Sequence, residues 1–148
     1  MKIKCSMQII ENNSHRHYLG IRLSNRDIKA YLNTFKKKVG EKKYHLYTNM
    51  QKKRDRDIYH ITTITPDEYE TIIENVDISN FSGEYFVELI GVGMVSNDAN
   101  EAYFIIVESE KLQIFRKNIG LPQKDFHVTL GFKLEDIHHV SKAIETMI

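Results

Sequence analysis

The feature that most constrains the fold of this chain is a strict alternation of residue type from position 125 to position 132. The residues of one parity are all apolar: Phe126, Val128, Leu130 and Phe132. Those of the other parity are small or polar: Asp125, His127, Thr129 and Gly131. Successive side chains of a β-strand point to opposite faces, so the segment predicts a strand with one buried face. His127 and Thr129 are then expected to face solvent or a cleft, with Gly131 beside them leaving room for close approach.

The centre of this strand has a counterpart in the first half of the chain. Tyr59-His60-Ile61-Thr62 and Phe126-His127-Val128-Thr129 share an aromatic residue, a histidine, a β-branched residue and a threonine. In a strand, each histidine shares a face with the threonine two positions later. Two such pairs across one cleft would supply an acid/base couple and hydroxyl donors for a phosphate. Chance pairs of this kind also occur, so two surface histidines on unrelated strands remain the alternative.

The rest of the chain predicts alternating strands and helices. Further strands are expected at 18–23, 57–64, 84–95 and 102–108, the last two forming a hairpin. Helices are expected from residue 24 or 25 to Gly40, at 65–75, 109–119 and about 135–147. The second of these begins with a capping box, in which Thr65 caps, Pro66 suits the first turn and Glu68 completes the box. Residues 41–56 are expected to form a polar, lysine-rich loop.

This order of elements indicates an α+β protein with two similar halves. Each half is expected to end in helix, loop, His-x-Thr strand and helix, as in a diverged internal duplication. A chain of 148 residues suits one domain, 1–148. We expect it to contain lobes of approximately 1–76 and 77–148, between which strands can be exchanged.

The formal charge of +1 conceals a local excess of basic residues. Nine lysines and arginines fall between residues 36 and 56, which would attract a polyanion, although a solvated helix end and loop is an equally good interpretation. One cysteine excludes an internal disulfide, and no histidine has companions at metal-ligand spacing, so no metal site is expected. Neither a membrane-length apolar run nor a signal-peptide core is present, and the cytoplasm is the expected location.

Four further residues are candidates for substrate binding. Arg54 and Arg56 share parity with His60, so an early start of that strand would aim them at the same cleft. The alternative is that they pair with the neighbouring aspartates at the surface. Tyr18 and Arg22, on the first predicted strand, are candidates for the edge of the cleft.

The paired motifs resemble those of the 2H phosphoesterase superfamily. Residues 51–69, 103–121 and 124–140 look like its Swiss-Army-Knife 2H subgroup, which is associated with RNA-repair-like proteins, and the resemblance runs from residue 18 to 140. It implies a two-lobed, pseudo-symmetric α+β fold whose mainly antiparallel sheets line a central cleft, with helices outside. It also implies that His60 and His127 are catalytic and that Thr62 and Thr129 bind phosphate, without cofactor or metal.

The function implied is a metal-independent phosphodiesterase that acts on RNA-type linkages, above all 2′,3′-cyclic phosphate ends, in RNA processing or repair. One neutral imidazole would accept a proton and the other, as imidazolium, would donate one. The partner would be an RNA or nucleotide with a cyclic or internal phosphodiester, and no membrane. Two alternatives stay open: a hydrolase of small cyclic oligonucleotides, and a catalytically silent RNA- or nucleotide-binding domain.

Overall fold

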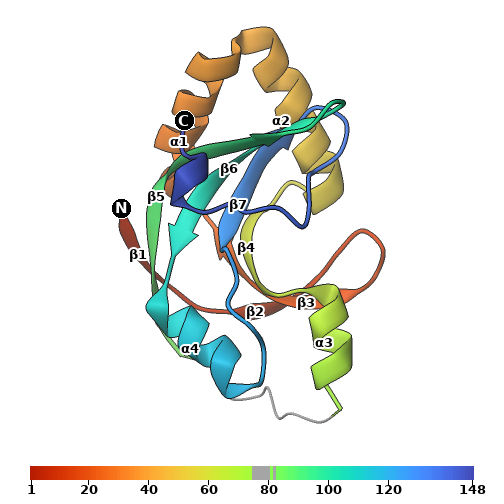
Figure 1. Cartoon of the computed structure of the whole chain (residues 1–148), viewed down its shortest axis with the longest axis vertical. Coiled ribbons are helices and arrows are strands. Elements are labelled where there is room, and N and C mark those ends of the chain that lie inside the picture. Colours follow the sequence, from red (N-terminus) through yellow and green to blue (C-terminus); the bar gives the residue numbers. More distant parts are fainter. Residues whose placement is uncertain (75–80, 82) are drawn as a thin grey trace.

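The two strands that carry the His-x-Thr motifs are neighbours inside one antiparallel sheet. The computed structural model describes residues 1–74, 81 and 83–148, and Figure 1 shows how their strands curl into an open half-barrel. Within this part of the chain the sheet has seven strands in the order β1-β5-β6-β7-β4-β3-β2. Their bounds are β1 Lys2–Cys5, β2 Gln8–Glu11, β3 His17–Leu23, β4 Tyr59–Ile64, β5 Tyr85–Ser96, β6 Glu101–Glu108 and β7 His127–Phe132. The α+β fold class is therefore confirmed.

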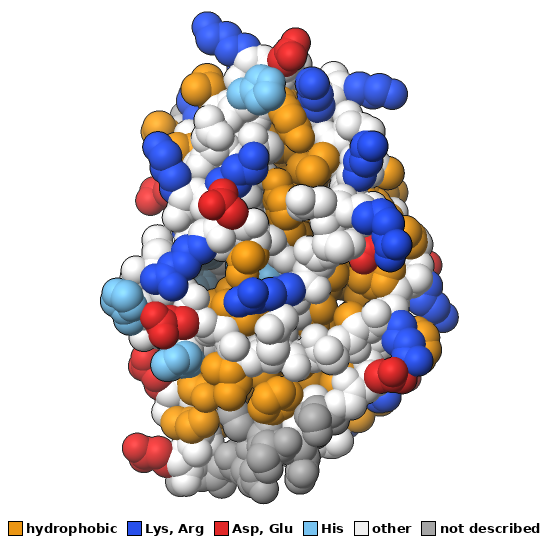
Figure 2. All heavy atoms as spheres, turned by 180° about the vertical axis from the view of Figure 1, so that it is seen from behind, with side chains coloured by type: hydrophobic (Ala, Val, Ile, Leu, Met, Phe, Trp, Pro, Cys, Tyr) orange, Lys and Arg blue, Asp and Glu red, His pale blue; other side chains and the backbone are white. Residues whose placement is uncertain are grey.

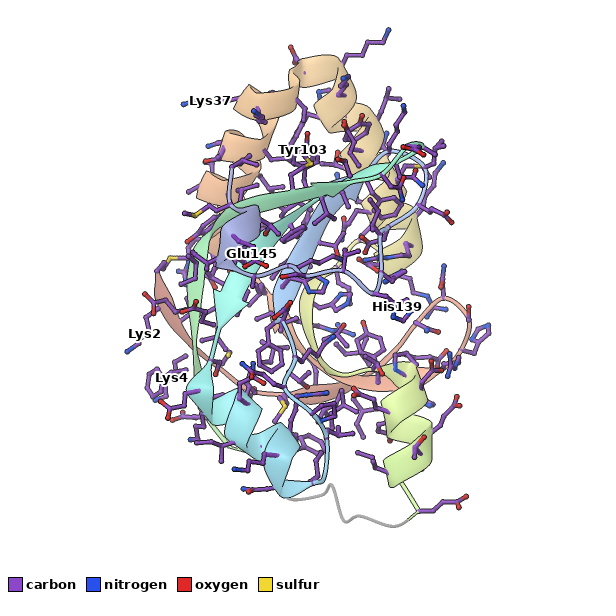
Figure 3. All side chains as sticks on the ribbon, in the orientation of Figure 1. Lys2, Lys4, Lys37, Tyr103, His139 and Glu145 are labelled. Atoms are coloured by element: carbon purple, nitrogen blue, oxygen red, sulfur yellow. The ribbon has the colours of Figure 1, made fainter. Side chains whose placement is uncertain are left out.

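The helices gather at the two ends of the sheet (Figure 1). α1 (Asn25–Val39) and α2 (Glu41–Asp55) lie side by side at one end, and α3 (Pro66–Ile72) and α4 (Glu110–Asn118) lie at the other. Tyr103 of β6 points toward α1, as Figure 3 shows, and its ring stacks on Phe35 of α1 with centroids 4.7 Å apart. This helix-covered face of the sheet holds the main core.

The predicted starts of α1 and α3 are confirmed by their caps. Ser24 caps α1 by accepting a hydrogen bond from the Asp27 amide, and Gly40 ends that helix with φ of 87°. Both bonds of the capping box at Thr65 and Glu68 are present. α3 ends at Ile72, short of the expected residue 75. The predicted connection 77–83 lies outside the described residues except for 81 and 83.

The structure differs from the predicted order of elements in three places. Residues 41–55 form α2 instead of a loop, because lysine, glutamate and glutamine favour helix even without a clear apolar stripe. The predicted helix at 135–147 is wrong: only Ile144–Thr146 form a short 3₁₀ turn. Side chains divert its backbone, since the Lys142 amide donates to the Asp125 carboxylate and the Ile137 amide to that of Asp136.

The two N-terminal strands are the third difference, because no pattern predicted them. β1 pairs with β5 in the second half of the chain, and β2 pairs with β3 in the first. Both are four-residue edge strands with mostly exposed side chains, so they lack the alternation that reveals a half-buried strand.

Candidate active site

The register between β4 and β7 sets the geometry of the candidate site. Ile61 pairs with Val128 in antiparallel register. Around that pair, antiparallel geometry places His60 opposite Thr129 and Thr62 opposite His127. Side chains directly opposite have Cβ atoms about 4.5–5.5 Å apart, and diagonal neighbours such as the two histidines about 7–8 Å apart. One phosphate group fits between imidazoles at that spacing.

Burial shows which face these four residues occupy. Ile61 and Val128 are completely buried, on the face covered by helices. His60, Thr62 and His127 are half-buried and Thr129 retains 8% exposure. The alternation predicted for both strands at the histidines is therefore present, and the four side chains share the face opposite the helices, where Asp136 and Lys142 of the C-terminal segment contact Thr129 and His127.

His127 is held in one tautomer. Its Nδ1 lies 3.0 Å from the backbone carbonyl of Asp125, which can only accept, so Nδ1 carries the proton and Nε2 the lone pair. The ring meets Phe104 edge-on, with centroids 5.8 Å apart. Burial, reinforced by the positive charge of Lys142, lowers the pKa of His127 to about 3. The free protein thus presents a neutral imidazole with an accepting Nε2.

His60 has a different environment. Its ring lies against Tyr18, with centroids 5.3 Å apart, and Arg22 is its cross-strand neighbour on β3. Burial lowers the pKa of His60, while the negative charge of Asp55 opposes that effect. Its buried Nδ1 has no hydrogen-bond partner among residues 1–74, 81 and 83–148. A buried polar atom without a partner is costly, so His60 differs from His127, whose Nδ1 is satisfied by a backbone carbonyl.

Asp136 is central to the site and was not predicted. Its carboxylate accepts from Arg54 at 2.5 Å and from the Thr129 hydroxyl at 3.3 Å, and lies 3.4 Å from the Lys142 ammonium. Although burial raises the pKa of Asp136, the charges of Lys142 and Arg54 outweigh it and hold that pKa well below its usual range. Asp136 and Lys142 both lie in the segment predicted as a helix, where sequence spacing gave no sign that they would reach β7.

The basis for placing Arg54 and Arg56 at the cleft was wrong, because neither lies on an extended strand. Arg54 is in the last turn of α2, and Arg56 follows it in left-handed conformation with φ of 55°. Arg54 does pair with Asp55, its Nε lying 2.8 Å from that carboxylate, but this ion pair is largely buried and not at the surface as the alternative had it. Arg56 lies 4.0 Å from Glu11.

All four predicted substrate-binding residues nevertheless meet in one cavity of about 320 Å³. Its walls come from β2, β3, α2 and the turn after α2: Glu11, Asn12, Tyr18, Arg22, Arg54, Asp55, Arg56 and Ile58. Tyr18 and Arg22 both adjoin His60, so the cavity opens beside one half of the candidate site.

Gly131 does not share the face of His127, contrary to the prediction. Tyr103 pairs with Gly131 and Phe104 with Thr129, so Leu130 is an extra residue in β7. Such a bulge reverses the facing of the residues beyond it. A Cβ at Gly131 would lie 2.9 Å from the backbone of Tyr47 in α2. The glycine does permit a close approach, but the approaching group is a helix of the same chain.

The basic segment lies on α1 and α2, and Figure 2 shows lysine and arginine side chains spread over that end of the molecule. An open groove of about 710 Å³ runs there, lined by Asn25, Arg26, Lys29, Leu32, Tyr44, Lys52, Asp57 and Tyr59. Arg56 lines the cavity beside His60 and Asp57 lines this groove. The two hollows are thus adjacent along the chain.

An antiparallel sheet in which two His-x-Thr strands lie side by side is the arrangement that the resemblance to the two-histidine phosphoesterases implies. Residues 18–138 match the model of the family described as Swiss Army Knife, 2H phosphoesterase domain, and the chain belongs to that family. No curated protein and no solved structure matches the chain. In the described part of the chain, no helix is both long and apolar enough to cross a bilayer, and no three histidine, cysteine or acidic side chains cluster as a metal ion would need.

Proposed function

We propose that the protein is a metal-independent phosphodiesterase that cleaves RNA-type linkages, with 2′,3′-cyclic phosphate ends as its preferred substrates. The observation that carries the proposal is the register of Ile61 with Val128, which gathers two imidazoles and two hydroxyls on the face opposite the helices. Family membership supports phosphoester chemistry, and the groups present suit proton transfer at a phosphate.

The proposed reaction on a cyclic phosphate proceeds by in-line displacement. One neutral imidazole accepts a proton from water as the water oxygen bonds to phosphorus. The bond from phosphorus to one ribose oxygen breaks, and the other histidine, as imidazolium, protonates that oxygen to leave a phosphomonoester. Each positioned proton transfer typically contributes about 10²–10⁴ in rate. With an internal RNA linkage, the ribose 2′-hydroxyl would take the place of water.

Thr62 and Thr129 would donate hydrogen bonds to the non-bridging oxygens during this step. The Thr129 hydroxyl donates to Asp136 in the free protein, so it must turn from that carboxylate to the phosphate. Tyr18, Arg22, Arg54 and Arg56 would hold the adjoining nucleotide in the cavity beside His60, the two more exposed arginines, Arg22 and Arg56, reaching a neighbouring phosphate.

Two observations bear on the substrate. The groove between α1 and α2, which carries Arg26, Lys29 and Lys52, would suit a longer anionic substrate and favours RNA. The cavity itself, at about 320 Å³, has the size of a small-ligand site and favours the second candidate, a hydrolase of small cyclic oligonucleotides. Both use the same four groups, so only turnover separates them.

The test incubates the protein in EDTA with nucleoside 2′,3′-cyclic phosphates, cyclic-phosphate-ended RNA and a panel of cyclic oligonucleotides. We expect turnover of the first two substrates, with a loss of at least about 100-fold in His60→Ala and in His127→Ala. His45→Ala is the matched control, because that histidine on α2 is exposed and lies beside Glu41, 3.8 Å away. Turnover confined to cyclic oligonucleotides would establish the second candidate. Binding without turnover of any substrate would indicate a silent domain, and loss of activity in EDTA would contradict the metal-independent chemistry.

A further inference from the structure

We propose that Lys142 is a positioning residue that keeps His127 neutral and thereby makes His127 the proton acceptor, leaving His60 as the proton donor. The inference rests on the proposed function and deepens it, since the two motifs alone do not distinguish the roles of their histidines.

Lys142 is buried beside His127 and makes specific contacts there. The segment that carries it continues to Glu145, which Figure 3 shows in front of the sheet. The lysine side chain is only 4% exposed, and its ammonium lies 3.4 Å from Nε2 of His127. A lysine is rarely so deeply buried unless it has specific partners.

Lys142 and His127 also share two neighbours. The backbone carbonyl of Asp125 accepts from His127 Nδ1, and the carboxylate of the same residue accepts from the Lys142 amide at 3.1 Å. The rings of Phe104 and His127 meet edge to face. The Lys142 ammonium lies over the Phe104 ring, 5.5 Å from its centroid. Asp125, in the loop before β7, and Phe104, in β6, thus hold Lys142 beside the His127 imidazole.

The charges around the two histidines differ. Lys142 and Lys124 face His127, and Asp136 is the opposing carboxylate. Asp136 lies 2.5 Å from Arg54 but 3.4 Å from Lys142, so Arg54 neutralises it more directly. The Lys142 charge therefore stays effective at His127 and opposes a second cation there. Burial opposes the imidazolium at both histidines, but at His60 the Asp55 charge favours it, against the opposing charges of Arg54 and Arg22.

The contact of Lys142 with His127 suits a group that moves when substrate binds. Hydrogen bonds between an ammonium and an acceptor are normally shorter than the 3.4 Å seen to both His127 and Asp136. A phosphodiester would offer the ammonium a charged oxygen in place of Nε2. Nε2 would then be free to accept the proton of water or of the 2′-hydroxyl.

The first test measures the pKa of the His127 imidazole by NMR in the free protein, so it does not depend on activity. We expect Lys142→Met to raise that pKa by at least about one unit, a tenfold change in proton affinity, and Lys142→Arg to leave it within a few tenths. Lys133→Met is the matched control, because Lys133 is exposed just beyond β7. A merely structural role would lower stability without this charge-dependent shift.

The second test follows the pH dependence of kcat/KM for cyclic-phosphate hydrolysis. The acidic limb should move to higher pH in Lys142→Met and stay in place in Lys142→Arg. Lys142→Gln gives the same comparison if the methionine variant does not fold. Asp136→Asn should move the acidic limb to lower pH, because it removes the negative charge that favours the His127 imidazolium. An unchanged His127 pKa in a folded, uncharged variant would overturn the inference. If the His127 pKa shifts as expected but no substrate is turned over, the proposed function is refuted and the effect of Lys142 on His127 stands.

Discussion

At the residue scale, the adjacent threonines Thr62 and Thr63 of β4 have different environments. Thr62 shares the face of His60, whereas Thr63 is fully buried and its hydroxyl donates to the Leu19 carbonyl at 2.9 Å. A hydrogen bond to a charged phosphate is worth about 1.5–3 kcal/mol, and one between neutral groups about 0.5–1.5 kcal/mol. If Thr62 binds the phosphate as proposed, activity and stability depend on different neighbours within one strand.

We expect Thr62→Val to lower kcat/KM on a cyclic phosphate by about 10- to 150-fold with little effect on folding. Thr63→Val should leave kcat/KM unchanged and cost about 1 kcal/mol of unfolding free energy, because a buried carbonyl loses its donor. Steady-state kinetics and urea denaturation of both variants check this pair. The idea that Thr62 binds the phosphate would be wrong if both variants had parental kinetics.

At the element scale, the parts of the site that the sequence predicted are those carried by periodic strands. Alternation in β7 and the shared motif in β4 placed His60, Thr62, His127 and Thr129 correctly on one face. The bulge at Leu130 has no sequence signature, so the facing of Gly131 was predicted wrongly. The capping box predicted the start of α3 correctly. The sequence of α2 lacks an apolar stripe, so its pattern did not distinguish a helix from a lysine-rich loop.

The bulge leads to a prediction about how β7 supports α2. A methyl group at Gly131 would meet the Tyr47 backbone at 2.9 Å, and backbone cannot turn aside as a flexible side chain can. Gly131→Ala should therefore cost about 1–3 kcal/mol of unfolding free energy. Gly91→Ala is the control, because its nearest neighbour is the flexible Met147 side chain. Equal urea midpoints for the two variants would mean that α2 does not depend on this close approach.

At the scale of the whole molecule, the site is assembled from segments far apart in the sequence. The β4–β7 junction supplies the four motif residues, while Arg54 comes from α2, Tyr18 from β3, and Asp136 and Lys142 from the C-terminal segment. Local patterns predict which face a side chain takes within one element. They do not predict that a non-helical segment returns across the sheet, which is why the charged partners of His127 were missed.

This assembly buries histidines in neutral form, so the stability of the folded protein should depend on pH. The pKa of His127 is lowered to about 3 by burial and by Lys142, and burial also lowers the pKa of His60. The unfolded chain, with histidine pKa values near 6.5, binds more protons below that pH than the folded protein does. Stability is therefore complete above about pH 6.5 and falls as the pH decreases toward the folded pKa.

We expect His127 to lower the free energy of unfolding by about 1 kcal/mol between pH 7.5 and 5.5, measured by urea denaturation. The Asp136 carboxylate does not contribute to this change, because its pKa in the folded protein lies below the usual carboxyl range and its stabilising effect is lost only in more acidic solution. His127→Gln should therefore make the fall in unfolding free energy over this window smaller by about that amount. His45→Gln, on the exposed surface of α2, should leave the change intact. A parental pH dependence in His127→Gln would show that this histidine is not held neutral by the fold.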